Sequence, residues 1–235
     1  MAIPKIDVVM PAAGSGKRMG ADIPKQYLKL GSSTILEITV RALLKSDVTQ
    51  NIIIGLSEDD QWFDKLPIAK DKRIIKAHGG NERSDTVRNC LAKVSTAYVM
   101  VHDAARPLVD PDDIKKLALS CTAEGFDDGG ILASPVADTI KQELNDTLSV
   151  DKTVPRQHLY RALTPQLFKT ALLKEALQYA YDNGIAITDD ASAMELYGYH
   201  PKLIPGSSTN IKITTPDDLL IANAIISSTE NHQDK

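Results

Sequence analysis

Short continuous runs of hydrophobic residues alternate along this chain with segments of helical periodicity. The first run, Ile6–Met10, is rich in β-branched residues and predicts a strand buried on both faces of a sheet. Similar runs predict further strands over residues 51–56, 74–77, 98–102 and 129–136. The sequence has no internal repeat and no low-complexity linker that would separate these strands into different units.

Helix signals fill the intervals between the strands. Thr34 and Glu37 have the spacing of a capping box, which predicts a helix that runs to about residue 45. Asp110 followed by Pro111 predicts another helix start. Further helices are expected over residues 84–94, 165–183 and 188–197 and from residue 215 onward. The alternation predicts an α/β fold with a Rossmann-like, mostly parallel sheet and helices on both faces.

The segment from about residue 137 to residue 163 interrupts this alternation. Two short strands around Asn145 and Asp146 predict a β-hairpin that protrudes from the sheet as an arm. An insertion of this size in a compact domain usually has a function. The arm could therefore cover an active site or embrace a second subunit.

A glycine-rich segment, Pro11–Gly20, directly follows the first strand. In an α/β sheet, the carboxyl end of such a strand is where nucleotides bind, because small residues let backbone N–H groups approach phosphate oxygens. Arg18 and Lys25 add two positive charges, which suit a polyphosphate whose charge grows during a reaction. The alternative is a flexible basic turn, but the strand context favours phosphate binding.

Two familiar phosphate-binding motifs do not match this segment. A P-loop needs glycine where Pro11 stands and Ser or Thr where Arg18 stands. The dinucleotide fingerprint G-x-G-x-x-G needs a closer spacing than Gly14, Gly16 and Gly20 provide. Both motifs are therefore excluded.

The composition narrows the possible classes of protein. A chain of 235 residues can form one large domain, so we expect a single domain over residues 1–235. The formal net charge of −4 argues against nonspecific binding to nucleic acid. No apolar run reaches 18 residues and no leader segment precedes the first strand, so we expect a cytoplasmic protein without a membrane span.

The cysteines and histidines give no sign of a metal site. Cys90 and Cys121 lie far apart in helix-like patterns, so we expect two buried or half-buried thiols without a disulfide. The five histidines are scattered without metal-binding spacing, which argues against a catalytic zinc ion.

Polar residues gather at the ends of two other strands, where the functional groups of this architecture lie. Asp103 follows the fourth strand and could hold a metal ion or a ribose hydroxyl, and Arg106 could bind a phosphate. A structural Asp–Arg pair that ties the loop fits equally well. Gly80 and Thr86 follow the third strand, where a plain turn and helix cap is the alternative.

Two further polar positions have a simpler structural interpretation. Thr188 precedes a predicted helix, and its segment Thr-Asp-Asp is first of all an N-cap. Lys212 lies in a predicted apolar strand over residues 210–214, where a solvent-facing lysine is common.

The ordered set of motifs resembles the 2-C-methyl-D-erythritol 4-phosphate cytidylyltransferases of the non-mevalonate isoprenoid pathway, over essentially the whole chain. The motifs are Ala-Ala-Gly-x-Gly-x-Arg-Met at 12–19, Pro-Lys-Gln at 24–26, Gly-Gly-x-x-Arg at 79–83, His-Asp-Ala-Ala-Arg-Pro at 102–107, Pro-Val-x-Asp-Thr-Ile-Lys at 135–141, Leu-Thr-Pro-Gln at 163–166, Thr-Asp-Asp-Ala-Ser at 188–192 and Asn-Ile-Lys-Ile-Thr at 210–214. Thr86 stands where the family usually has Ser, and Ser134 stands where Ala is usual.

The resemblance implies a reaction between CTP and 2-C-methyl-D-erythritol 4-phosphate that gives the CDP-alcohol and pyrophosphate. It also implies Mg²⁺ or another divalent cation as the cofactor. The acceptor phosphate would attack the α-phosphate of CTP in line, without a covalent enzyme intermediate. Catalysis would then consist of positioning and charge neutralisation.

The resemblance also implies roles for individual residues. The implied catalytic residues are Arg18, Lys25, Arg156 and Lys212. The implied CTP contacts are Pro11, Ala12, Ala13, Gly14, Gly16, Gly80, Thr86 and Asp103, and Asp103 would also meet the metal ion through water. The implied acceptor contacts are Arg106, Thr139, Thr164 and Thr188. The arm would form a homodimer and carry Arg156 into the site of the second subunit.

Two other functions stay open from the sequence alone. A cytidylyltransferase that acts on ribitol 5-phosphate would share the nucleotide-binding half of the motif set. A nucleotide-binding regulator without catalysis would not need both Arg18 and Lys25, nor Arg156 and Lys212 on the acceptor side.

Overall fold

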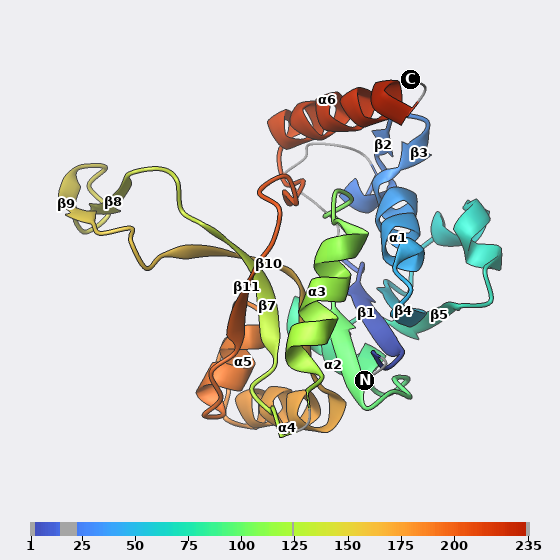
Figure 1. Cartoon of the computed structure of the whole chain (residues 1–235), viewed down its shortest axis with the longest axis horizontal. Helices are drawn as coiled ribbons and strands as arrows, with labels where there is room; N and C mark the ends of the chain where they lie inside the picture. The colour runs from blue at the N-terminus through green and yellow to red at the C-terminus, as the bar shows by residue number, and fades with distance from the viewer. Residues whose placement is uncertain (1–2, 15–22, 124, 234–235) are drawn as a thin grey trace.

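A seven-stranded sheet runs through the centre of the computed structural model, which describes residues 3–14, 23–123 and 125–233 (Figure 1). Its strands are β1 (Ile6–Pro11), β4 (Thr49–Leu56), β5 (Ile74–His78), β6 (Tyr98–Val101), β7 (Gly130–Pro135), β10 (Tyr160–Lys169) and β11 (Lys202–Pro205). They lie in the order β11-β7-β10-β6-β1-β4-β5. Only β10 runs antiparallel to its neighbours, β6 and β7, so the prediction of a mostly parallel sheet is confirmed.

Helices cover both faces of this sheet, as the sequence predicts. They are α1 (Ile35–Lys45) and α3 (Pro111–Cys121) on one face, and α2 (Arg83–Leu91), α4 (Thr170–Asp182) and α5 (Asp190–Leu196) on the other. Consecutive side chains of a strand point to opposite faces, and Val8 and Val9 of β1 accordingly pack into different hydrophobic clusters. Both residues are fully buried, which explains why this run shows no alternation of polar and apolar positions.

The remaining elements are short, apart from the last helix, α6 (Pro216–Gln233). They are the 3-10 helices η2 (Lys25–Tyr27), η3 (Phe63–Lys65) and η4 (Pro67–Lys70), and two small hairpins, β2 (Lys29–Leu30) with β3 (Ser33–Thr34) and β8 (Ile140–Glu143) with β9 (Val150–Val154). The predicted capping box of α1 is present, because the Thr34 hydroxyl accepts the Glu37 N–H and the Glu37 carboxylate accepts the Thr34 N–H.

The helix predicted over residues 165–183 is wrong in its first part. Residues up to Lys169 belong to β10, and α4 begins only at Thr170. A run that is buried on both faces has the same pattern in a strand and in a buried helix, and Pro165 favoured the helix interpretation. In the sheet, the missing N–H of Pro165 is tolerated because the register between β10 and β7 shifts between Ala162 and Gln166.

Two other local expectations also need correction. Residues 210–214 do not form a strand, although the Ile213 N–H donates to the Ala105 carbonyl at 2.9 Å. The short parallel strand β11 has no counterpart in the prediction, because only four residues pair and three of them are exposed. Short edge strands of this kind carry too little hydrophobic pattern to be recognised.

The arm extends away from the rest of the molecule, with β8 and β9 at its tip (Figure 1). Asn145 and Asp146 adopt φ of 44° and 57°, the left-handed conformation that a tight hairpin turn needs, so the predicted hairpin is confirmed. The tip exposes apolar side chains, among them Leu148 with 96% exposure and Val150 with 62%. Such a surface is typical of a segment that packs against another molecule.

Both cysteines are free and buried, as expected. Burial raises the pKa of the Cys90 thiol to about 12 and that of Cys121 to about 11, so both thiols stay protonated. Within the described residues, no helix combines the length and the apolar character needed to cross a membrane.

The turn that leads into β7 requires glycine at position 129, where φ is +70°. A Cβ atom there would lie 2.4 Å from Cδ1 of Phe168 and 2.5 Å from the Leu167 carbonyl oxygen. We expect Gly129→Ala to lower the free energy of unfolding by about 3 kcal/mol, from backbone strain and overpacking together. Gly184 has φ of +63° with open space around it, so Gly184→Ala should cost only about 1 kcal/mol. Urea unfolding of both variants measures the difference, and equal losses would contradict the packing argument.

Candidate functional site

The candidate site lies at the carboxyl ends of β1 and β6, where the chain connections diverge. β4 lies on one side of β1, and the chain reaches it through α1. β6 lies on the other side of β1, and the chain reaches it later, after α2. In open α/β sheets such a switch point leaves a crevice for a ligand. The pocket found there is lined by Pro11, Ala12, Ala13, Gly14, Lys25, Gln26, Gly80, Asn81, Glu82, Arg83, Thr86, Asp103, Ala104, Ala105 and Lys212.

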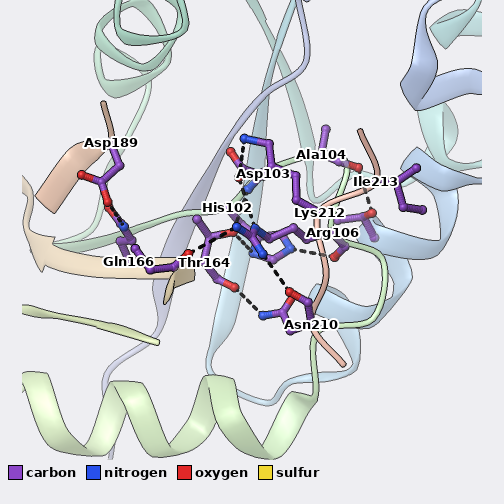
Figure 2. Close-up of polar contacts among 12 residues, drawn as sticks. His102, Asp103, Ala104, Arg106, Thr164, Gln166, Asp189, Asn210, Lys212 and Ile213 are labelled. Atoms are coloured by element: carbon purple, nitrogen blue, oxygen red, sulfur yellow. Dashed lines mark hydrogen bonds and ion pairs between the residues drawn. The ribbon is translucent and has the colours of Figure 1, made fainter. Parts of the chain in front are cut away.

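Asp103 is the centre of the charged groups in this crevice (Figure 2). Its Oδ1 accepts from Nε of Arg83 at 3.2 Å, and its Oδ2 accepts from Nε of Arg106 at 3.3 Å and pairs with Nζ of Lys212 at 3.0 Å. Burial alone would raise the pKa of this carboxyl. The charges of Arg83, Lys212 and Arg106 outweigh burial and hold the pKa well below its usual range, so Asp103 is ionised.

Arg83 is a further charged residue of the site, beyond those predicted from the sequence. Its guanidinium connects two carboxylates, because Nε contacts Asp103 and Nη2 contacts Oδ2 of Asp190 at 2.8 Å. Burial would lower the pKa of Arg83, but the charges of Asp190 and Asp103 raise it above its ordinary value. The motif Gly-Gly-x-x-Arg contains this residue, so a signal was present, but only the fold shows that Arg83 reaches from α2 to the start of α5.

Asp190 is fully buried, and burial raises its pKa above the ordinary value of an aspartate despite the charge of Arg83. Its second oxygen, Oδ1, has no hydrogen-bond partner among the described residues. Arg83 therefore supplies the interaction that stabilises this carboxylate inside the protein.

His102 connects the site to β10 through a chain of hydrogen bonds (Figure 2). Its Nε2 lies 3.1 Å from the Arg106 carbonyl, which can only accept, so Nε2 carries the proton. Nδ1 then accepts from the Thr164 hydroxyl at 3.0 Å, and that hydroxyl oxygen accepts the Asp103 N–H at 3.1 Å. Burial lowers the pKa of His102 to about 4, so the imidazole is neutral and holds the Asp103 loop against Thr164.

The guanidinium group of Arg106 donates hydrogen bonds to three groups of the protein itself. Besides Asp103, it donates through Nη1 to the Asn210 carbonyl at 2.7 Å and through Nη2 to the Ala162 carbonyl at 3.4 Å. Burial lowers the pKa of Arg106 below its ordinary value. The structural Asp–Arg pair, one of the two interpretations of this motif from the sequence, is present. Through Arg106 it connects residues 103, 162 and 210.

Hydrogen bonds hold the backbone on the side of the crevice that contains Gly80 and Thr86, two of the predicted CTP contacts. The Gly80 N–H donates to the Thr86 hydroxyl at 2.9 Å, and this hydroxyl donates to the Glu82 carbonyl at 3.2 Å. Lys25 Nζ donates at 3.3 Å to the carbonyl of Ile213, the residue that follows Lys212. Of the other predicted CTP contacts, Pro11, Ala12, Ala13 and Gly14 line the pocket, whereas Gly16 and the catalytic candidate Arg18 lie outside the described residues.

A second pocket adjoins the first and shares Arg83, Asp103 and Lys212 with it. Its other lining residues are Arg106, Ala162, Leu163, Thr164, Gln166, Thr188 and Asp189. Gln166 donates to the Asp189 carboxylate at 2.7 Å and accepts the Ala191 N–H at 2.9 Å, which fixes the start of α5 against β10. Three of the four predicted acceptor contacts, Arg106, Thr164 and Thr188, therefore lie around one pocket.

The other two predicted residues of the acceptor side belong to the arm. Thr139 and Arg156 are exposed, and the Arg156 guanidinium donates to the Ala137 carbonyl. Neither residue lines the two pockets of its own chain. Thr139 and Arg156 would therefore contact a bound substrate only in the pocket of a second protein molecule.

Asp103 is a carboxylate that lines both pockets and could contribute to holding a metal ion. No group of three or more His, Cys, Asp or Glu side chains that could hold a metal ion occurs in the described part of the chain. Mg²⁺ at nucleotide sites commonly uses one or two carboxylates, with phosphate oxygens and water as the other ligands. Asp103, ionised and lining both pockets, fits this type of site but could not form one alone.

Comparison with known families gives one result over nearly the whole chain. Residues 6–228 match the family model described as "IspD: 2-C-methyl-D-erythritol 4-phosphate cytidylyltransferase". A protein named 2-C-methyl-D-erythritol 4-phosphate cytidylyltransferase from Serratia proteamaculans (strain 568) is 48% identical over 229 residues, which are 97% of each chain. One from Pectobacterium atrosepticum is 48% identical over 225 residues, or 93% of each chain.

Solved structures agree with the sequence comparison. The crystal structure of a 4-diphosphocytidyl-2C-methyl-D-erythritol synthase has a TM-score of 0.80 and 34% identity, over 96% of this chain and 100% of that one. The crystal structure of 2-C-methyl-D-erythritol 4-phosphate cytidylyltransferase from Thermus thermophilus has a TM-score of 0.79 and 31% identity, over 94% and 98% of the two chains.

The buried His102 makes stability depend on pH. Its pKa is about 4 in the folded protein and about 6.5 when exposed, so the unfolded chain binds more protons between these values. We expect the free energy of unfolding to fall by roughly 3 kcal/mol from this residue as the pH decreases from 6.5 to 4. His102→Gln should have a flatter profile in this window in urea unfolding. Parallel profiles of the two proteins would contradict the assignment.

Proposed function

This chain belongs to the 2-C-methyl-D-erythritol 4-phosphate cytidylyltransferase family, and from that premise we propose how its site carries out the reaction. The enzyme transfers CMP from CTP to 2-C-methyl-D-erythritol 4-phosphate in the non-mevalonate isoprenoid pathway. The alternatives of a ribitol 5-phosphate enzyme and of a regulator without catalysis are therefore set aside.

We further infer that residues 1–235 form a single domain, since seven strands form one continuous sheet.

One observation supports the proposal most directly: the two pockets meet at Arg83, Asp103 and Lys212. CTP would occupy the first pocket, with its base toward Gly80 and Thr86 and its triphosphate toward Gly14 and Lys25. The methylerythritol phosphate would occupy the second pocket. The shared wall then lies where the acceptor phosphate and the α-phosphate of CTP have to approach each other.

The reaction needs no nucleophile from the protein. An oxygen of the acceptor phosphate attacks the α-phosphorus of CTP, a new P–O bond forms, and the bond to the bridging oxygen breaks as pyrophosphate leaves. Lys25 and Lys212 both line the first pocket and would neutralise the charge that builds up on the transferred phosphoryl group. The proposed role of Arg18, which follows four residues after Gly14 in the sequence, is the same.

The family typically uses a divalent cation, and we propose that Asp103 helps to hold Mg²⁺ together with the triphosphate. The ion, when bound, supplies Lewis-acid stabilisation of phosphate charge. Asp103 also keeps Lys212 and Arg83 in place through its ion pairs, whichever ligand is bound.

We propose that the arm completes the acceptor site of a second copy of this chain. Thr139 directly precedes β8 and Arg156 follows β9, so both flank the protruding hairpin, whose tip carries exposed apolar side chains. A two-stranded hairpin with this surface is marginally stable without a partner. The proposed assembly is a homodimer in which each arm delivers Arg156 to the acceptor phosphate of the other subunit.

Substitution of Lys25 and of Arg18 tests the catalytic assignment. We expect Lys25→Ala and Arg18→Ala each to lower kcat about a hundredfold, because a charged donor to the transition state contributes on the order of 3 kcal/mol. Pyrophosphate release from CTP with 2-C-methyl-D-erythritol 4-phosphate measures the rate. Lys45→Ala, an exposed change on α1, provides a control that should keep normal turnover. Nearly normal turnover in the Lys25 or the Arg18 variant would remove that residue from the mechanism.

Mixed dimers test the contribution of the arm. Arg156→Ala and Lys25→Ala chains, each nearly inactive alone, should recover part of the activity when their subunits are exchanged. A mixed dimer would have one site with both substitutions and one with neither, so up to about a quarter of normal activity returns in an equal mixture, in which about half of the dimers each have one intact site. Exchange followed by native mass spectrometry and the pyrophosphate assay gives the result. Lack of recovery in exchanged dimers, or a monomer by light scattering, would refute the shared site.

A further inference from the structure

We propose that Gln26 is a positioning residue, which sets the distance between the backbone of Ala12–Gly14 and Lys25. Its side chain is 4% exposed, and Nε2 donates to the Ala12 carbonyl at 2.6 Å. This bond joins two residues that are 14 positions apart in the chain. The inference rests on the role proposed above for Lys25.

Ala12, whose carbonyl accepts from Gln26, is also held by β4 through its own N–H group. The Ala12 N–H donates to the Gly55 carbonyl of β4 at 2.9 Å, and the Ala12 side chain is 4% exposed. The Ala12 backbone thus continues the pairing of β1 with β4, and the Gln26 side chain is attached to the sheet through its hydrogen bond to Ala12. The loop backbone that would meet the phosphates begins with the next residues, Ala13 and Gly14.

Tyr27, two residues after Lys25 in η2, is anchored independently of the Gln26 bond. Tyr27 is 4% exposed, its hydroxyl donates to Oδ2 of Asp60 at 2.5 Å, and its ring stacks on Trp62 with centroids 5.7 Å apart. Asp60 is held in turn, since its Oδ1 accepts the N–H groups of Trp62 and Phe63 at 3.1 and 2.9 Å. The β4–β5 connection therefore keeps η2 in place even where the Gln26 contact is lost.

These two anchors have different consequences for Lys25. The Tyr27 anchor fixes η2 to the body of the protein, whereas the Gln26 bond fixes η2 to the start of the loop backbone. A Lys25 ammonium must be placed to within a fraction of an ångström relative to the phosphates to act on a developing charge. Loss of the Gln26 bond alone should therefore leave the fold intact and reduce turnover.

Two substitutions of Gln26 remove the donor while the size of the side chain is kept. Gln26→Glu places an acceptor against the Ala12 carbonyl, and Gln26→Met leaves a neutral chain of similar length. Gln50→Glu makes the same charge change at an exposed position of β4 and is the matched control. The emission of Trp62, the single tryptophan, reports whether η2 and its stacking partner remain folded.

We expect both Gln26 variants to lower kcat at least about tenfold, with KM for the acceptor within about threefold of the normal value and Trp62 emission unchanged. Gln50→Glu should keep normal kcat. The inference is overturned if either Gln26 variant keeps kcat within about twofold, or if kcat falls only together with a changed Trp62 emission, since Gln26 would then act through local folding. A parallel Lys25→Ala measurement separates the two proposals: normal turnover in that variant refutes the role of Lys25 itself.

Discussion

Three cationic side chains from three segments of the chain converge on the carboxylate of Asp103. Without this anion, Coulomb repulsion among Arg83, Arg106 and Lys212 in a largely buried crevice would drive them apart. Even with the Asp190 carboxylate included, the cluster retains one positive charge in excess. The fold thus holds these cations around a central anion, at the place where we propose that the phosphate groups of the substrates bind.

Individual helices, strands and the arm could be predicted from the sequence more readily than the pairing of the strands. Buried strands, capping signals and the arm follow from patterns that extend over neighbouring residues, and the structure has them close to the predicted positions. β10 escaped recognition because its central part is buried on both faces, where helix and strand share one pattern. Its antiparallel course between β6 and β7 depends on pairing partners that are far away in the sequence.

The same distinction applies to the site residues. Asp103 and Lys25 stood out because charge at the end of a buried strand or in a glycine-rich loop is a local signal. Arg83 and Gln26 belong to the quoted motifs, yet their roles arise from contacts with residues 107 and 14 positions away in the chain, respectively. No pattern of neighbouring residues reveals such a contact. The ion pair of Lys212 could not be predicted for the same reason, because its partner, Asp103, is distant in sequence, although the Lys212 side chain is still 37% exposed.

β10 is a single strand that begins at the exposed Tyr160 beside the arm and ends beyond the fully buried Phe168. Its ten residues span roughly 33 Å in an extended strand, and Thr164, which holds both His102 and the Asp103 backbone, lies near its middle. β10 pairs with β7 over residues 160–162 and 166–167 and with β6 from Gln166 to Lys169, and Thr164 lies in the stretch where the register shifts. One continuous segment of backbone therefore connects the base of the arm, where we propose that a second subunit binds, with the hydroxyl group that holds the Asp103 backbone.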